Sequence, residues 1–175
     1  ILLLLSSPQL ASSGVSDVTI TAIVKNGDNV MLADVPVVFS ADSGSLLVTQ
    51  STTDQNGQAI ATLNPGLDFT NRTITISAVA GNITASVTVD VAGTSLDISG
   101  DNAATLGDII PLTIVLTDSA DAPIANKVVS LTSALGNTLS ASILTTDNAG
   151  QVQLNVTAST SGTDTITATA QGVTA

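Results

Sequence analysis

The sequence is marked first by the residue types that it lacks. Among its 175 residues there is no cysteine, histidine, tryptophan, tyrosine or glutamate, and there are only two phenylalanines. The absence of cysteine excludes a disulfide framework, and the absence of both cysteine and histidine excludes the common pairing of a nucleophile with an imidazole base. A carboxylate pair that hydrolyses glycosides would lack aromatic partners for the sugar, because Phe39 and Phe69 are the only aromatic residues. We therefore predict that the chain is not an enzyme and needs no cofactor for catalysis.

Basic residues are almost as scarce. Lys25, Arg72 and Lys127 stand against fourteen acidic residues, all of them aspartate, and the net charge is −11. Because phosphate binding needs clustered lysine and arginine, nucleic acid is excluded as a partner. Each half of the chain carries seven aspartates, and this even spread favours a solvated surface over a localised acidic tail.

Long apolar runs are missing as well. No stretch approaches the roughly twenty apolar residues of a membrane span, so we predict no span in this sequence. The opening run Ile1–Leu5 has no basic flank and is short for the apolar core of a signal peptide. We predict that it forms a first β-strand.

What the sequence does contain is an internal repeat, with an offset of about ninety residues between its copies. Three pairs of segments carry it: Ile20-Thr-Ala-Ile-Val24 with Leu112-Thr-Ile-Val-Leu116, Thr52-Thr-Asp-Gln-Asn-Gly-Gln58 with Thr145-Thr-Asp-Asn-Ala-Gly-Gln151, and Thr75-Ile-Ser-Ala78 with Thr165-Ile-Thr-Ala168. The repeat predicts two domains, residues 1–92 and 93–175. Tandem units of this size favour an architectural role over catalysis.

Apolar and polar residues alternate along most of each copy, which is typical of half-buried antiparallel strands. The residues predicted to point inward keep the same parity in both copies: Val18, Ile20, Ala22 and Val24 match Ile110, Leu112, Ile114 and Leu116; Ala59, Ala61 and Leu63 match Val152, Leu154 and Val156; Ile76, Ala78 and Ala80 match Ile166, Ala168 and Ala170. A slip of one residue would expose such a set, so the parity predicts two facing sheets in each copy. With turn signals about every ten residues, we predict an all-β fold of two tandem immunoglobulin-like β-sandwiches.

The two copies differ at their last strand. In the first copy, Ile83–Val91 alternates over its whole length, whereas the second copy reaches only Val173–Ala175, the counterpart of Ile83–Ala85. The final strand of the second domain is therefore predicted to be incomplete, and we expect a longer parent protein with further copies. Between the copies, Ala92–Thr94 is a short linker, which predicts a semi-rigid rod.

These motifs resemble the bacterial Ig-like domains of the intimin and invasin type, the Big-1 group. The resemblance rests on the repeated segments above, on Val35-Pro-Val-Val-Phe39 and on Ile76-Ser-Ala78; the second copy departs from it with Leu131 at the place of Phe39 and Val152 at that of Ala59. It implies a bacterial cell-surface protein, attached to the outer membrane or secreted. Relatives are often adhesins in which such domains hold a terminal binding module away from the membrane. Receptor binding does not carry over, because the cysteines of that module are absent.

Two sets of aspartates are candidates for metal binding. Asp54 with Gly57, and Asp147 with Gly150, lack the ligand series and closing glutamate of an EF-hand, and we predict simple turns there. A second set flanks the domain junction, where carboxylates from two domains can share a hard cation such as Ca²⁺. The candidate interdomain metal ligands are Asp90, Asp97, Asp101 and Asp108. The alternative is that these four are solvated side chains on exposed strands and loops.

The function that we predict is a stalk or spacer in a bacterial surface adhesin. Its partners would be the neighbouring Ig-like repeats of the same chain and, through domains outside this sequence, a host or surface ligand. Two alternatives stay open. A direct binding module for a host receptor or glycan would need exposed aromatic or hydrophobic hot spots. An accessory domain of a secreted enzyme would need a catalytic domain elsewhere in the protein.

Overall fold

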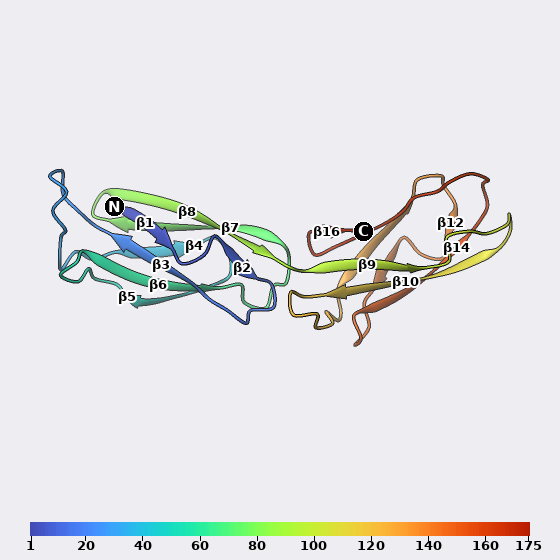
Figure 1. Cartoon of the computed structure of the whole chain (residues 1–175), viewed down its shortest axis with the longest axis horizontal. Coiled ribbons are helices and arrows are strands. Elements are labelled where there is room, and N and C mark those ends of the chain that lie inside the picture. Colours follow the sequence, from blue (N-terminus) through green and yellow to red (C-terminus); the bar gives the residue numbers. More distant parts are fainter. The chain divides into compact units, whose positions relative to one another are not determined.

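The computed structural model describes all residues, 1–175, and divides into two compact units, Ile1–Ala92 and Gly93–Ala175 (Figure 1). Every regular element in both units is a β-strand. No helix capable of crossing a membrane is present. The predicted all-β fold of two immunoglobulin-like sandwiches is confirmed.

Unit 1 consists of two four-stranded sheets. The first sheet contains, in spatial order, β1 (Leu2–Leu5), β3 (Val18–Ile23), β6 (Gln58–Asn64) and β5 (Ser45–Gln50). The second contains β2 (Gln9–Ala11), β8 (Ile83–Ala92), β7 (Arg72–Ala80) and β4 (Val38–Ala41). Neighbouring strands are antiparallel, except that the short β2 pairs with β8 in parallel.

Unit 2 repeats this plan with changes at the edges of its sheets. Its first sheet contains β12 (Thr138–Leu139), β14 (Gln151–Thr157), β10 (Ile109–Thr117) and β9 (Ser95–Gly100). Its second sheet contains β13 (Ile143–Thr145), β11 (Val128–Ser133), β15 (Ile166–Ala170) and β16 (Val173–Thr174). No strand corresponds to β2, and β16 is much shorter than β8.

The core of unit 1 lies between its two sheets and follows the predicted parity. Alternate residues of β3, β6 and β7 are buried, and Phe39 packs with them. The same alternation buries the inner faces of β10 and β14 in unit 2. Two residues depart from the prediction, because Ile110 and Ile166 are only half-buried although they occupy inward positions. Parity therefore identifies the inward face but not how completely each residue is covered.

Candidate functional site

The repeated Thr-Thr-Asp motif forms the same turn in both units. In unit 1 the Oδ1 atom of Asp54 accepts hydrogen bonds from the backbone N–H groups of Asn56 (2.8 Å) and Gln58 (2.9 Å). The bond from Gln58 is the main cause of the lowered pKa of Asp54. In unit 2, Asp147 accepts equivalent bonds at 2.8 and 2.9 Å. The prediction of a turn is confirmed, since these carboxylates bond the backbone of their own turn.

A glycine closes each of these turns against the neighbouring strand. Gly57 and Gly150 have φ values of 71° and 69°, in the left-handed region that favours glycine. A Cβ atom would lie 2.6 Å from the carbonyl oxygen of Val24 at the first site and 2.5 Å from that of Leu116 at the second. Both the conformation and the close backbone approach therefore require glycine.

A buried threonine precedes each turn aspartate and was missed by the sequence analysis. The Thr53 hydroxyl donates to the carbonyl of Leu32 (2.7 Å) and accepts from the N–H of Val35 (2.9 Å). In unit 2, Thr146 does the same between Ile124 and Lys127 at 2.8 and 2.9 Å. The signal was available, because the threonine stands at the same place of the motif in both copies. Its role is to satisfy loop backbone groups that would otherwise be buried without partners.

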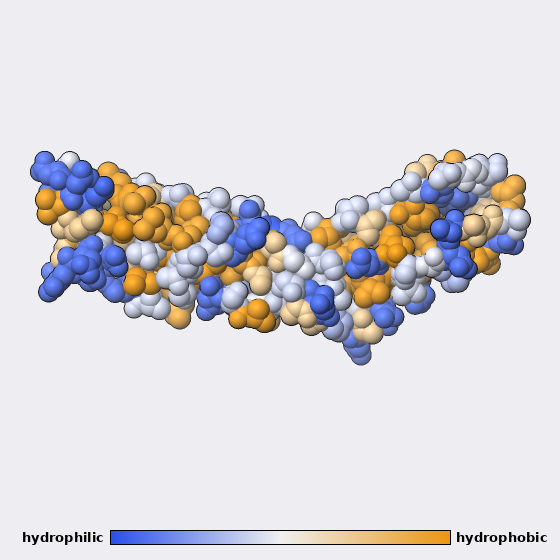
Figure 2. Space-filling view, viewed as in Figure 1, coloured by the Kyte–Doolittle hydropathy of each residue, from blue (hydrophilic) through white to orange (hydrophobic).

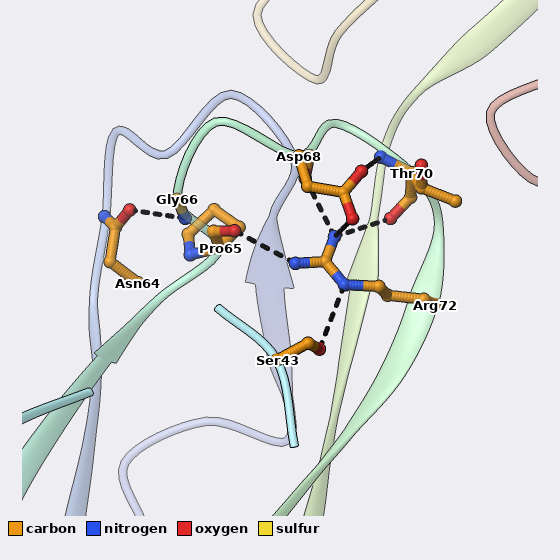
Figure 3. Close-up of polar contacts among 7 residues, drawn as sticks. All are labelled: Ser43, Asn64, Pro65, Gly66, Asp68, Thr70 and Arg72. Atoms are coloured by element: carbon orange, nitrogen blue, oxygen red, sulfur yellow. Dashed lines mark hydrogen bonds and ion pairs between the residues drawn. The ribbon is translucent and has the colours of Figure 1, made fainter. Parts of the chain in front are cut away.

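Arg72 holds a loop of unit 1 in place (Figure 3). Its guanidinium group donates to the carbonyl oxygens of Asp68 (2.8 Å), Thr70 (3.0 Å) and Pro65 (2.9 Å), and to the Ser43 hydroxyl (3.2 Å). It also forms an ion pair with the Asp68 carboxylate at 3.3 Å. The guanidinium is thus engaged inside its own unit, and Arg72 acts as a structural clasp for the loop that precedes β7.

In unit 2, a carboxylate organises the corresponding region. Asp164 accepts hydrogen bonds from the Ser133 hydroxyl (2.5 Å), the backbone N–H of Leu135 (2.7 Å) and the side-chain amide of Asn137 (2.9 Å). Burial raises the pKa of Asp164, but the hydrogen bonds outweigh that effect and the pKa lies below its ordinary value. Asp164 links the loop after β11 to the segment that leads into β15.

A cavity of about 510 Å³ lies beside this segment of unit 2. Apolar side chains of the sandwich interior contribute to its wall, and polar groups stand around them. Its lining includes Ile110, Leu112, Val156 and Ile166, together with Asp101, Leu106, Gly162 and Asp164. Asp101 is the one predicted metal ligand that lines this cavity.

The four predicted junction ligands are all exposed. Asp90 lies on β8 and accepts a hydrogen bond from the Thr73 hydroxyl at 2.7 Å, while Asp97 lies on β9. Asp101 follows β9, and Asp108 accepts hydrogen bonds from the N–H and hydroxyl of Thr105, which lower its pKa. The structure contains no group of three or more acidic side chains placed to hold a metal ion. The calcium site stays a prediction.

The features described above define a class of protein: tandem Ig-like β-sandwiches with a repeated Thr-Asp-x-x-Gly turn. The chain belongs to the family of bacterial Ig-like domains (group 1), whose model matches residues 3–92 and 94–175. The resemblance noted in the sequence is thereby confirmed.

Among characterised proteins, the chain is similar to intimin of Escherichia coli O127:H6 (strain E2348/69 / EPEC), with 28% identity over 166 residues. That match covers 90% of this chain but only 17% of intimin. The solved structure of the Yersinia pseudotuberculosis adhesin InvE has a TM-score of 0.59 at 20% identity and covers 99% of this chain and 56% of that one. Invasin, described as a bacterial integrin-binding protein, has a TM-score of 0.51 at 21% identity and covers 99% and 38%. The two structural likenesses support the fold.

Proposed function

We propose that the two units are spacer domains of a bacterial cell-surface adhesin, attached to the outer membrane or secreted. The observation that carries this proposal is that the polar side chains repeated in both units, Asp54 with Asp147 and Thr53 with Thr146, make their hydrogen bonds inside their own unit. Such residues stabilise their own unit, and their hydrogen-bonding groups are already used there instead of being available to a ligand. The similarity to intimin supplies the adhesin context.

The composition of the surface supports a spacer over a receptor-binding module. Binding hot spots are enriched in tryptophan, tyrosine and arginine. The chain has no tryptophan or tyrosine, Phe39 is buried, and the single arginine is engaged by the loop that precedes β7. Figure 2 shows polar and apolar residues interspersed over both units on the face in view.

The test compares binding with mechanics. The purified chain is applied to cultured epithelial cells and to a glycan array, and its extension under force is measured by single-molecule pulling. A spacer shows no saturable binding and gives two unfolding events, one for each unit. Saturable binding that is competed by unlabelled chain would overturn the proposal and favour the receptor or glycan module.

The junction calcium site is tested separately. Thermal unfolding and small-angle scattering are recorded with millimolar calcium and with a chelator. If Asp90, Asp97, Asp101 and Asp108 bind Ca²⁺, calcium raises the thermal midpoint, and replacing Asp97 and Asp101 with Asn removes that rise. Identical curves in calcium and chelator would leave a spacer that is independent of metal.

A further inference from the structure

The sequence contains two Asn-Gly pairs, Asn26-Gly27 and Asn56-Gly57, and the fold of unit 1 places them in different surroundings. In such a pair the backbone nitrogen of the glycine can attack the side-chain amide carbon of the asparagine, because glycine has no Cβ atom to obstruct the approach. Both asparagines are exposed. The reactivity of each pair therefore depends on the hydrogen bonds and the backbone conformation around it.

The first pair lies in the loop that follows β3 in unit 1 (Figure 1). Lys25 and Met31 form an isolated antiparallel bridge, and between them the N–H of Asn29 donates to the carbonyl of Asn26 at 3.2 Å. Gly27 is exposed, and its N–H makes no hydrogen bond within the loop. The attacking nitrogen is therefore free of a competing partner.

The side-chain oxygen of Asn26 is already bound by two backbone donors. Its Oδ1 atom accepts hydrogen bonds from the N–H groups of Asp28 (2.9 Å) and Val30 (3.0 Å). These bonds polarise the side-chain carbonyl and make its carbon a better target for the nitrogen. The attack turns the oxygen into an oxyanion, and donors at such distances stabilise the charge that develops there. The loop therefore favours the addition step.

The second pair is held in a closed turn. The N–H of Gly57 donates to the carbonyl of Asp54 at 2.9 Å, and the Nδ2 group of Asn56 donates to the carboxylate of Asp54 at 3.3 Å. Gly57 is buried, and its carbonyl accepts the N–H of Val24 at 2.8 Å. Because both the nitrogen and the amide are engaged, reaction at this pair requires the turn to open first.

We propose that Asn26 is a site of spontaneous deamidation and backbone isomerisation. The Gly27 nitrogen loses its proton to solvent and bonds to Cγ of Asn26, the Cγ–Nδ2 bond breaks, and Nδ2 takes up a proton and leaves as ammonia. Water then opens the resulting succinimide ring. Cleavage of the bond between Cγ and the Gly27 nitrogen gives aspartate, and cleavage at the main-chain carbonyl gives isoaspartate, in which the chain continues through Cγ. The net reaction consumes one water and releases one ammonia.

The modification changes both the charge and the backbone of the loop. Either product replaces a neutral amide with a carboxylate. Isoaspartate also adds a carbon atom to the main chain, so the bond from the N–H of Asn26 to the carbonyl of Val30 (3.0 Å) and the bridge between Lys25 and Met31 lose their register. The change is confined to the loop because β3 ends at Ile23. This proposal is independent of the spacer role.

The test incubates the whole chain at neutral and at alkaline pH and follows both asparagines by peptide mapping, with fragmentation that distinguishes isoaspartate from aspartate. Conversion is expected at Asn26 and should be about tenfold or more slower at Asn56, because only the second pair lies in a turn that must open. Conversion at Asn26 should be faster at alkaline pH, since the nitrogen attacks after it has lost its proton. Equal conversion of the two asparagines, or faster conversion of Asn56, would overturn the proposal.

Gly27→Ala is the matched variant. Gly27 does not have a positive φ, and an added Cβ atom would meet nothing within 4 Å, so the loop keeps its conformation. Conversion at Asn26 should fall by about tenfold, because the Cβ atom restricts the approach of the nitrogen, and conversion at Asn56 should stay the same. An unchanged rate at Asn26 in this variant would contradict attack by the Gly27 nitrogen.

The chain unfolded in guanidinium chloride separates the effect of the fold from that of the local sequence. The two pairs should convert at similar rates there, since both are Asn-Gly and neither is held in a turn. If Asn26 converts in the unfolded chain but not in the folded one, the loop protects it and the proposal is wrong. A contrast of the same size in the unfolded chain would assign the difference to neighbouring residues and overturn the structural explanation.

Discussion

The two units differ at the corner of the sandwich where β7 and β15 begin: in unit 1 the long strand β8 covers this corner and closes it, whereas in unit 2 β16 spans only Val173–Thr174 and leaves it open. In unit 1, Arg72 clasps the loop before β7, and β8 runs beside the whole of β7. At the matching positions of unit 2, Gly162 stands for Arg72 and Asp164 for the buried Ile74. Both units nevertheless keep the same central strand pair and the same aspartate turn. The central strand pair, β3 with β6 and β10 with β14, and its aspartate turn are therefore the same in both units. The residues at the start of β7 and β15 differ.

A second contrast lies on the outer face of the first sheet. In unit 1, Leu2 and Leu4 are about half exposed and stand opposite Ile23 and Thr21. In unit 2, Asp97 and Ser99 hold the equivalent places on β9. Inward residues of β3 and β6 thus keep their apolar character in β10 and β14, whereas outward residues of this sheet change freely, because only the inward face is constrained by the opposite sheet.

The largest expected effect is the difference in stability that is lost when an isoleucine is truncated at the closed corner and at the open one. Ile76→Ala should cost unit 1 about 2–5 kcal/mol, as large-to-small changes in a sealed core do. Ile166→Ala, at the matching but half-buried position, should cost unit 2 about 1 kcal/mol, because less apolar surface is lost and no closed cavity forms. Urea unfolding followed by hydrogen exchange in each unit measures both. Equal losses would show that the two corners are packed alike.

The next largest loss of stability is expected at Gly57 and Gly150, which occupy equivalent positions in the two units. Gly57→Ala and Gly150→Ala should each cost about 3 kcal/mol, from a strained φ and a Cβ pressed against a backbone carbonyl. Gly66→Ala is the matched control, since Gly66 has a φ of 75° but nothing within 4 Å of the added atom, and it should cost about 1 kcal/mol. Circular dichroism follows the unfolding, because the chain lacks tryptophan and tyrosine. Similar losses at Gly57 and Gly66 would show that the carbonyl contact is unimportant.

Sequence reasoning recovered the features that are local or repeated. The alternation of apolar and polar residues predicted the inward face of β3 and β10, and the Asp-x-x-Gly spacing predicted the turn. Both features depend on residues that are close together in the chain. It missed the clasp of Arg72, whose partners are mostly backbone carbonyls that carry no residue signature. It also missed Asp164, which meets Ser133 and Asn137 only after the fold brings distant loops together. Coverage of Ile166 depends on a neighbouring strand, which its own pattern cannot specify.

Loss of the hydrogen bonds of Arg72 is expected to lower the free energy of unfolding less than the core substitutions do. Arg72→Lys keeps the charge but loses the planar group that reaches three carbonyls, so unit 1 should lose about 1–2 kcal/mol. Hydrogen exchange should rise in residues 65–71 and stay unchanged in unit 2. Lys25→Arg is the control for a change between the two basic residue types at an exposed site. An unchanged exchange rate in the loop would mean that the loop holds itself without the guanidinium.

The smallest expected effect is a change in the pH dependence of stability that Asp164→Asn should cause in unit 2 alone. Because the pKa of Asp164 is lowered in the folded unit, its ionised form stabilises folding; that stabilisation is fully present above the ordinary pKa of 3.8 and is lost as pH falls through the lower folded value. Asp108, whose pKa is also lowered, adds to the same trend in unit 2. Asp164→Asn should therefore lower the thermal midpoint of unit 2 at pH 6 and flatten its fall between pH 5 and pH 2, about the window in which carboxylates titrate. Unit 1 has Ile74 at this position, so its own acid response, to which Asp54 contributes, should be the same in the variant and the parent chain. Midpoints recorded at several pH values, with hydrogen exchange assigning the change to a unit, decide the matter: an unaltered slope in unit 2 would mean that Asp164 is held by its partners equally in both protonation states.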